Sequence, residues 1–192
     1  EGFGNVGVFA FKFLSEAGAK IIAVSDSKGM IYNKNGINLN ELEKVKQESG
    51  SVVNYKNCEK KDSDKIIEVD ADILITAAIP DLIKPNDVNK LKFKLIVEGS
   101  NIPMSEETER ILYTKRTLVI PDIIANAGGV ISSYVEYKGG NEKEMFKLVE
   151  EKITKNVKHI LELSKKEKID TRDAALRIAK KRVLEKCKTC KV

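Results

Sequence analysis

The chain has 192 residues, of which 42% are hydrophobic and 33% charged, and its formal net charge is +5. This length fits one domain, or one domain with a helical extension, and the composition is that of a folded globular protein rather than a disordered one. No apolar run approaches the roughly 18 residues that a membrane-spanning helix needs, so we expect no membrane contact. No signal peptide is visible, but in a fragment this says little about the whole protein, for which we expect a cytoplasmic location.

The hydrophobic pattern predicts helices that alternate with short buried strands. Residues 5–17 carry apolar side chains at helical spacing, and Gly18 follows as a stop signal. Continuous apolar runs, typical of strands buried on both faces, occur at residues 21–24, 73–75, 95–97 and 118–120. This alternation predicts an α/β fold, a Rossmann-like, doubly wound and mostly parallel sheet with C-terminal helices.

The intervening segments carry turn and helix signals. Residues 30–37 are expected to form a small hairpin with Asn35 and Gly36 at its tip. Residues 40–48 are predicted to be helical. Ser105 is expected to cap a further helix, because an acidic first turn follows it.

The last third of the chain is predicted to be helical, with Thr171 capping its second helix. Residues 151–192 hold fourteen Lys or Arg against six Asp or Glu. These charges lie between apolar residues at helical spacing, which is typical of a solvated helix face. A nucleic-acid partner for this basic segment is the weaker interpretation.

Three cysteines, Cys58, Cys187 and Cys190, are present. An odd number without extracellular cues argues against a disulfide framework. The last two have C-x-x-C spacing, but zinc would need two more ligands, and a redox pair would begin a helix rather than end one. We therefore expect no metal site.

The motif G-x-G-x-x-G opens the first predicted helix, at Gly2, Gly4 and Gly7. Gly2 permits a tight turn, Gly4 lets the backbone approach a pyrophosphate, and Gly7 lets the helix pack closely. The helix N-terminus favours phosphate groups, and Asp26, 19 residues after Gly7, is placed to accept hydrogen bonds from an adenosine ribose. A ligand-free glycine turn and a methyltransferase are the weaker interpretations.

The strand that precedes this motif in a doubly wound fold, where it is the central strand, has no counterpart in the sequence. We therefore expect the chain to be a fragment of a longer protein.

Five segments carry a resemblance to a known family. They are Gly2-Phe3-Gly4-Asn5-Val6-Gly7, Ala23-Val24-Ser25-Asp26-Ser27-Lys28-Gly29, Ala77-Ala78-Ile79-Pro80, Glu98-Gly99-Ser100-Asn101 and Pro121-Asp122-Ile123-Ile124-Ala125-Asn126-Ala127-Gly128-Gly129-Val130. In this order they resemble the C-terminal domain of the glutamate/leucine/phenylalanine/valine dehydrogenase family, nearest to archaeal and bacterial glutamate dehydrogenases. The resemblance runs nearly the full length.

The resemblance implies reversible oxidative deamination of L-glutamate to 2-oxoglutarate and ammonia, with NAD or NADP as cofactor. The catalytic lysine and aspartate of such enzymes belong to an N-terminal domain that no stretch of this chain matches. We therefore assign no catalytic residue here and expect the chain alone to be inactive. The intact family is usually hexameric, so a homo-oligomer is expected of the whole protein.

The family's cofactor contacts carry over to matching positions. The cofactor-binding residues implied are Gly2, Phe3, Gly4, Asn5, Val6, Gly7, Asp26, Ser27, Ala77, Ala78, Ile79, Asn101 and Asn126. Asn101 matches the asparagine near the nicotinamide ribose and Asn126 the one near the carboxamide, where an amide both donates and accepts. Ser133 matches the substrate-contacting serine.

Residues 1–140 are expected to form the dinucleotide-binding domain and residues 141–192 to form helices that pack on it. Ser100 and Ile102 stand where many members have Ala and Gly, which changes the shape of that loop. The charge of Asp26 favours NAD over NADP, while Lys28 offsets it. A leucine, phenylalanine or valine dehydrogenase and a non-catalytic nucleotide-binding module remain the alternatives.

Overall fold

The computed structural model describes residues 1–187, so Cys190 lies outside the described residues. The α-helices are α1 (Asn5–Glu16), α2 (Leu39–Ser49), α3 (Glu106–Thr114), α4 (Asp122–Ala125), α5 (Gly128–Tyr137), α6 (Glu142–Glu167) and α7 (Thr171–Lys186). The strands are β1 (Ala23–Asp26), β2 (Gly29–Tyr32), β3 (Glu59–Lys61), β4 (Ile73–Thr76), β5 (Leu95–Glu98) and β6 (Leu118–Ile120). Short 3₁₀ helices are η1 (Val52–Asn54), η2 (Ser63–Glu68) and η3 (Pro85–Asp87).

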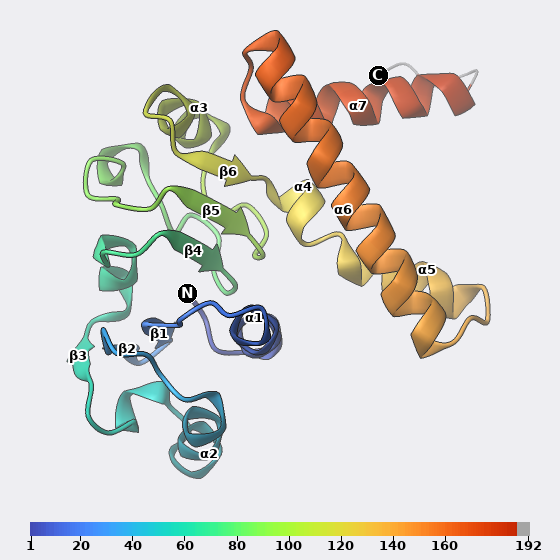
Figure 1. Ribbon diagram of the computed structural model, residues 1–192. Helices are drawn as coiled ribbons and strands as arrows, with labels where there is room; N and C mark the ends of the chain where they lie inside the picture. The colour runs from blue at the N-terminus through green and yellow to red at the C-terminus, as the bar shows by residue number, and fades with distance from the viewer. Residues whose placement is uncertain (188–192) are drawn as a thin grey trace.

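Two three-stranded sheets lie on one side of the molecule, with α5, α6 and α7 on the other (Figure 1). Strands β4, β5 and β6 are parallel, with Ile73 paired to Leu95 and Leu95 to Leu118. This sheet, with helices around it, confirms the predicted α/β class. Strands β1, β2 and β3 are antiparallel, so parallel pairing is confined to one half.

A cavity of about 560 Å³ separates β1 from β4. The residues that line it include Ile22 and Val24 in and before β1, Leu74 and Ile75 of β4, and Gly2.

The predicted hairpin at residues 30–37 is wrong in its position. The observed hairpin joins β1 to β2 through a two-residue turn, with Asp26 opposite Gly29. A Cβ at Gly29 would lie 2.9 Å from the Lys61 carbonyl oxygen, so glycine is what lets β3 pair alongside. Residues 33–36 instead form a turn in which the Gly36 N–H donates to the Asn33 carbonyl oxygen.

Two main hydrophobic clusters support the two sheets. The core of the parallel sheet includes Ile96 and Leu112, and the core of the antiparallel sheet includes Ile31 and Leu42. A smaller cluster around Ile160 joins α6, α7 and α4. Met30 of β2 lies in the core of the parallel sheet, with Ala23 and Tyr32 packed against it, so the two sheets also share a hydrophobic contact.

The N-cap of helix α7 is one residue earlier in the chain than predicted. Asp170, not Thr171, is the N-cap, because its carboxylate accepts the Asp173 N–H at 2.8 Å. The Thr171 hydroxyl instead donates to the Val119 carbonyl oxygen at 2.5 Å and ties α7 to β6.

Helix α5 and the start of α6 extend away from the sheets (Figure 1). Large apolar side chains are exposed there, with Val130 76% and Tyr137 85% accessible. A second exposed apolar row, with Phe9 and Phe13, lies on α1. Both faces offer surface for burial against another domain or subunit.

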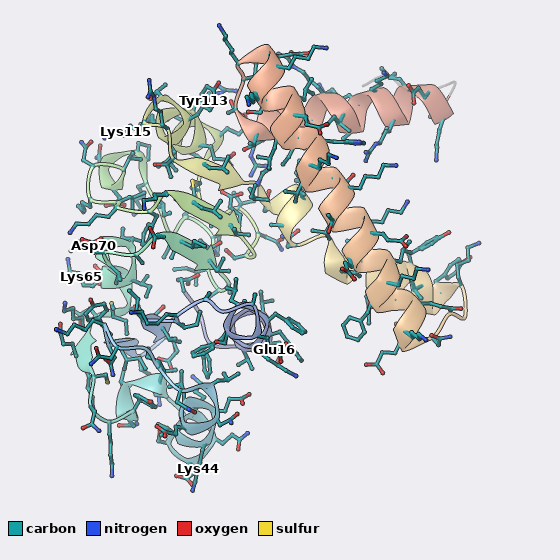
Figure 2. The ribbon with its side chains drawn as sticks, in the orientation of Figure 1. Glu16, Lys44, Lys65, Asp70, Tyr113 and Lys115 are labelled. Carbon is teal, nitrogen blue, oxygen red and sulfur yellow. The ribbon has the colours of Figure 1, made fainter. Side chains whose placement is uncertain are left out.

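The outer surface is highly charged, and Figure 2 shows Lys44, Lys65 and Lys115 around its edge. On α6 and α7 the lysines form exposed pairs such as Lys158 with Glu162 and Lys181 with Glu185. Such exposed pairs agree with the prediction that the basic residues of this segment lie on solvated helix faces. Among the described helices none is long and apolar enough to cross a membrane.

Candidate functional site

The glycine-rich loop lies between the ends of β1 and β4. The Gly2 N–H donates to the Ser25 hydroxyl at 3.3 Å, and a Cβ on Gly2 would lie 2.7 Å from the Ala78 Cβ. A Cβ on Gly7 would lie 1.9 Å from the Gly2 carbonyl oxygen. Gly2 and Gly7 therefore permit contacts within the loop that no other residue allows.

Gly4 has a different environment from the other two glycines. It is the N-cap of α1, has an extended backbone, and has no atom within 4 Å of the position of a Cβ. The first turn of α1 carries no acidic side chain. The open space thus lies beside unneutralised N–H groups at the positive end of a helix, where an anionic group is stabilised.

The ends of β4 and β5 are joined above the parallel sheet. The Ser100 hydroxyl donates to the Thr76 hydroxyl at 2.9 Å, and the Ser100 N–H donates to the Thr76 carbonyl oxygen. Ser100 stands where many family members have Ala, and its hydroxyl is therefore satisfied by the buried Thr76. Ala77, Ala78 and Ile79 follow β4 directly beside the glycine loop, with Ile79 54% exposed.

Asn101 and Asn126 come together although 25 residues separate them. The Asn126 side-chain amide donates to the Asn101 amide oxygen at 2.7 Å. Asn101 follows β5 and Asn126 ends the short helix α4 that follows β6, so both lie at the carboxyl edge of the parallel sheet. Ser133 is exposed on α5, farther along the chain from this pair.

Asp26 already has a full set of hydrogen-bond partners. It accepts from the Lys46 ammonium at 2.6 Å, the Val52 N–H at 2.9 Å, the Lys28 N–H at 2.9 Å and the Ser51 hydroxyl at 3.2 Å. Burial alone would raise the pKa of Asp26, but these bonds, led by that from Lys46, hold the pKa below its usual value. The carboxylate therefore ties β1 to α2 and η1, and the predicted ribose contact would compete with four existing bonds.

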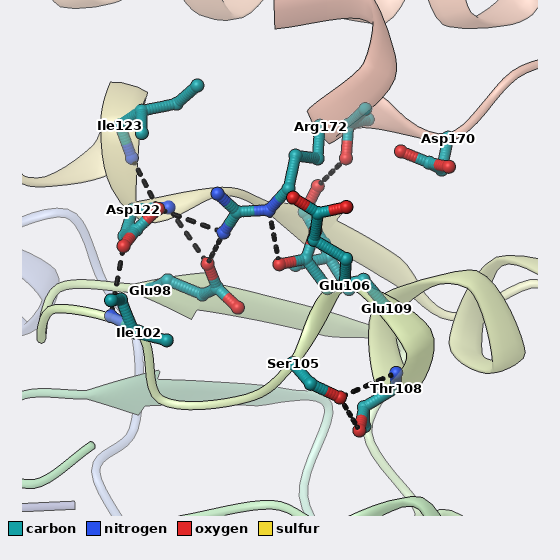
Figure 3. A network of polar contacts seen from close by, with 12 residues as sticks. Glu98, Ile102, Ser105, Glu106, Thr108, Glu109, Asp122, Ile123, Asp170 and Arg172 are labelled. Atoms are coloured by element: carbon teal, nitrogen blue, oxygen red, sulfur yellow. Dashed lines mark hydrogen bonds and ion pairs between the residues drawn. The ribbon is translucent and has the colours of Figure 1, made fainter. Parts of the chain in front are cut away.

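A buried ionic cluster lies between helix α7 and the parallel sheet (Figure 3). The Arg172 guanidinium contacts the carboxylates of Glu98, Glu109 and Asp122 at 2.6 to 3.0 Å, and each carboxylate is at most 8% exposed. One positive charge thus faces three acidic groups in a site with little water.

The pKa values of Glu98 and Glu109 are raised in this cluster, whereas the pKa of Asp122 is lowered. Burial, reinforced by the charge of Glu109, raises the pKa of Glu98 to about 8, and burial raises the pKa of Glu109 to about 7. Burial alone would raise the pKa of Asp122 too, but bonds from the Ile102 N–H and Arg172 hold it below its usual value. Glu98 Oε1 and Glu109 Oε2 have no hydrogen-bond partner among the described residues, so each is a place for a proton.

This ionic cluster was not predicted from the sequence. Two signals were available: Glu98 ends an otherwise apolar run, and Arg172 stands in the first turn of α7, where the helix dipole disfavours a cation. Each signal points to a specific buried partner.

Among residues 1–187, no group of three or more His, Cys, Asp or Glu side chains is arranged to hold a metal ion.

The family model described as Glutamate/Leucine/Phenylalanine/Valine dehydrogenase matches residues 1–189. The chain belongs to this family. A glutamate dehydrogenase of Aeropyrum pernix is 43% identical over 198 residues, covering 98% of this chain and 47% of that protein. An NADP-specific glutamate dehydrogenase of Saccharolobus shibatae is 41% identical, covering 98% of this chain and 46% of that protein. An NAD-specific glutamate dehydrogenase of Staphylococcus aureus is 37% identical, covering 96% and 46%.

A solved structure shows the same fold. The crystal structure of hetero-hexameric glutamate dehydrogenase from Thermus thermophilus, in its Leu-bound form, has a TM-score of 0.87 to this chain at 23% identity. The match covers 100% of this chain and 46% of the Thermus thermophilus chain. The chain therefore spans about half the length of the relatives it matches.

Proposed function

We propose that this chain is the cofactor-binding part of a cytoplasmic NAD(P)-dependent glutamate dehydrogenase. The whole enzyme would convert L-glutamate reversibly to 2-oxoglutarate and ammonia. Family membership and the names of the relatives support this choice over a leucine, phenylalanine or valine dehydrogenase. Residues 1–140 would be the dinucleotide-binding domain, with residues 141–192 packing on it.

One observation carries the proposal: a helix N-terminus beside open space and an asparagine pair lie at the same edge of the structure. The space at Gly4 fits a pyrophosphate, and the N–H groups of Asn5 and Val6 would bind it. Asn101 and Asn126 would orient the nicotinamide, because their amides donate and accept. When bound, the cofactor supplies hydride acceptance and donation.

At the adenosine end the charge balance favours binding of both coenzymes. Lys46, 2.6 Å from Asp26, offsets the charge that would repel a 2′-phosphate. Ser27 and Lys28 are exposed beside it. We propose that Ser27 contacts the adenosine ribose and that Lys28 attracts the 2′-phosphate of NADP, while Asp26 holds the turn that presents them.

The remaining parts of the reaction would come from outside this chain. Ser133 would contact the substrate, and an N-terminal domain would supply the catalytic lysine and aspartate. Exposed Val130, Tyr134 and Tyr137 on α5 suit burial against that domain or another subunit of a hexamer.

The test is a titration of NADH and NADPH with the purified chain, followed by nicotinamide fluorescence. The chain has no Trp, so protein emission is weak. We expect a saturable signal with both coenzymes in the wild type. In Gly4→Leu the signal should be strongly weakened, because the extended backbone tolerates the side chain while the side chain fills the phosphate space.

Ser15→Leu is the matched control, since it adds the same bulk to an exposed position at the other end of α1. It should bind like the wild type. A chain that is folded by circular dichroism but gives no signal with either coenzyme would overturn the proposed function.

A further inference from the structure

Arg172 links the C-terminal helix α7 to the interior of the parallel-sheet half. Its Nε donates to Glu109 Oε1 at 2.6 Å, and its Nη2 donates to Glu98 Oε2 at 3.0 Å and to Asp122 Oδ1 at 2.9 Å (Figure 3). The three acceptors come from α3, β5 and α4, so one guanidinium joins four elements. A fork of several N–H donors in fixed directions is what such a junction needs.

Two of these acceptors are bonded directly to the loops that carry the asparagine pair. Asp122 Oδ2 accepts the Ile102 N–H at 2.9 Å, and the Asp122 N–H donates to Glu98 Oε2 at 2.8 Å. Ile102 follows Asn101 in the chain, and Asp122 begins helix α4, whose C-cap is Asn126. Asp122 is therefore the point at which both loops meet.

The loop after β5 needs this support. Ile102 has a φ of +48°, a left-handed conformation that strongly disfavours a β-branched residue. Such a conformation persists only where surrounding contacts impose it. The Asp122 carboxylate supplies one such contact, and Arg172 holds that carboxylate in place.

The glycine loop is fixed by a different set of contacts. Gly2 bonds to Ser25 and packs on Ala77 and Ala78, and none of the cluster residues takes part. Disturbing Arg172 should consequently affect the asparagine end of the site and leave the phosphate end intact.

We propose that Arg172 is a positioning residue that, through Asp122 and Glu98, sets the separation of Asn101 and Asn126. This inference rests on the cofactor site proposed above. It gives the C-terminal helix a part in nicotinamide binding although α7 contributes no side chain to the asparagine pair itself. Arg172 acts through the backbone of Ile102 and the start of α4.

The test compares NADH with ADP, which has the adenosine and pyrophosphate but no nicotinamide. Arg172→Lys keeps the charge but replaces the fork by one nitrogen, which cannot serve both Glu109 and the Glu98–Asp122 pair. We expect about a tenfold weaker NADH affinity and an ADP affinity within about twofold of the wild type. The control is Arg177→Lys on the same helix α7, which alters an exposed ion pair to Glu167 of α6 and should change neither affinity.

Three results are distinguishable. If the wild-type chain binds neither ligand, the proposed cofactor site fails. If it binds both, and Arg172→Lys binds both as well as the wild type does, the positioning role is refuted. If Arg172→Lys weakens both equally, Arg172 only supports the fold and the positioning role is again refuted.

Should Arg172→Lys fail to fold by circular dichroism, Asp122→Asn gives the same comparison. It keeps an oxygen for the Ile102 N–H and removes the charge that Arg172 holds. A selective loss of NADH affinity supports the positioning role, and unchanged or equally weakened binding of the two ligands overturns it.

Discussion

Raising the pH from 6 to 8 should destabilise this protein, because the buried cluster holds protons that the unfolded chain releases. The pKa of Glu98 rises from its usual 4.5 to about 8 in the folded state, and that of Glu109 to about 7. A carboxyl with a raised folded pKa binds its proton more tightly when folded. Its contribution to stability is therefore greatest below pH 4.5, declines as the pH rises towards the folded pKa, and is constant above it.

The magnitude follows from the number of protons released on unfolding. Each proton lowers the free energy of unfolding by about 1.4 kcal/mol per pH unit. One proton shared by the two groups gives a loss of about 2 kcal/mol between pH 6 and pH 8, and two protons give about 4 kcal/mol. The Arg172 guanidinium stays charged throughout, because the carboxylates of Glu109 and Asp122 raise its pKa despite its burial.

The assay is urea unfolding of the wild type and Glu98→Gln at several pH values and constant ionic strength. Glu98→Gln should flatten the pH dependence by about one proton. Its amide leaves buried N–H groups without a partner, at a cost of about 1 to 3 kcal/mol, but that cost does not vary with pH. The slope, and not the absolute stability, is therefore the readout.

Glu106→Gln is the control, since Glu106 lies on the same helix as Glu109 but is 61% exposed. It should keep the wild-type slope. A wild-type free energy of unfolding that is constant or rises between pH 6 and pH 8 would refute the reasoning. So would the same slope in the wild type, Glu98→Gln and Glu109→Gln.

Three further substitutions have expected outcomes. Gly7→Ala should destabilise the protein by about 2 kcal/mol or more, because the new Cβ would lie 1.9 Å from the Gly2 carbonyl oxygen; an unchanged urea midpoint would contradict this. Ile102→Gly should stabilise it by about 0.5 to 1 kcal/mol in the same assay, since relief of the left-handed strain exceeds the entropy of glycine; a loss would show that the conformation costs little. Lys28→Gln should weaken NADPH about threefold more than NADH in the fluorescence titration, and an equal effect on both would remove Lys28 from coenzyme choice.

Local sequence signals predicted most of the secondary structure. The buried strands β4, β5 and β6 were expected from continuous apolar runs, and the start of α3 from Ser105, whose hydroxyl accepts the Thr108 N–H. These features depend on side chains close in the chain. The residues Asp26 to Gly29 also carry a turn signal, but the hairpin was placed at Asn35-Gly36, the stronger turn signal; which turn joins paired strands depends on the packing of Gly29 against β3.

In the candidate site, too, the local motifs were predictable from the sequence and the long-range contacts were not. The glycine motif and the separate positions of Asn101 and Asn126 were visible in the sequence, but their hydrogen bond to each other depends on the pairing of β5 with β6. Three of the four bonds to Asp26 come from Lys46, Ser51 and Val52, 20 to 26 residues away. Such long-range contacts leave no local pattern, and for that reason the sequence did not predict that Asp26 ties β1 to α2 and η1.

In the proposed binding mode a dinucleotide lies across the carboxyl edge of the parallel sheet, from the start of α1 to the asparagine pair. The most direct test is an amide NMR titration of the isotopically labelled 192-residue chain with NAD. We expect the backbone amides of Asn5 and Val6 and the side-chain amides of Asn101 and Asn126 to shift together and to saturate at one affinity. Shifts confined to α6 and α7, or no shifts in a folded chain at saturating NAD, would contradict it.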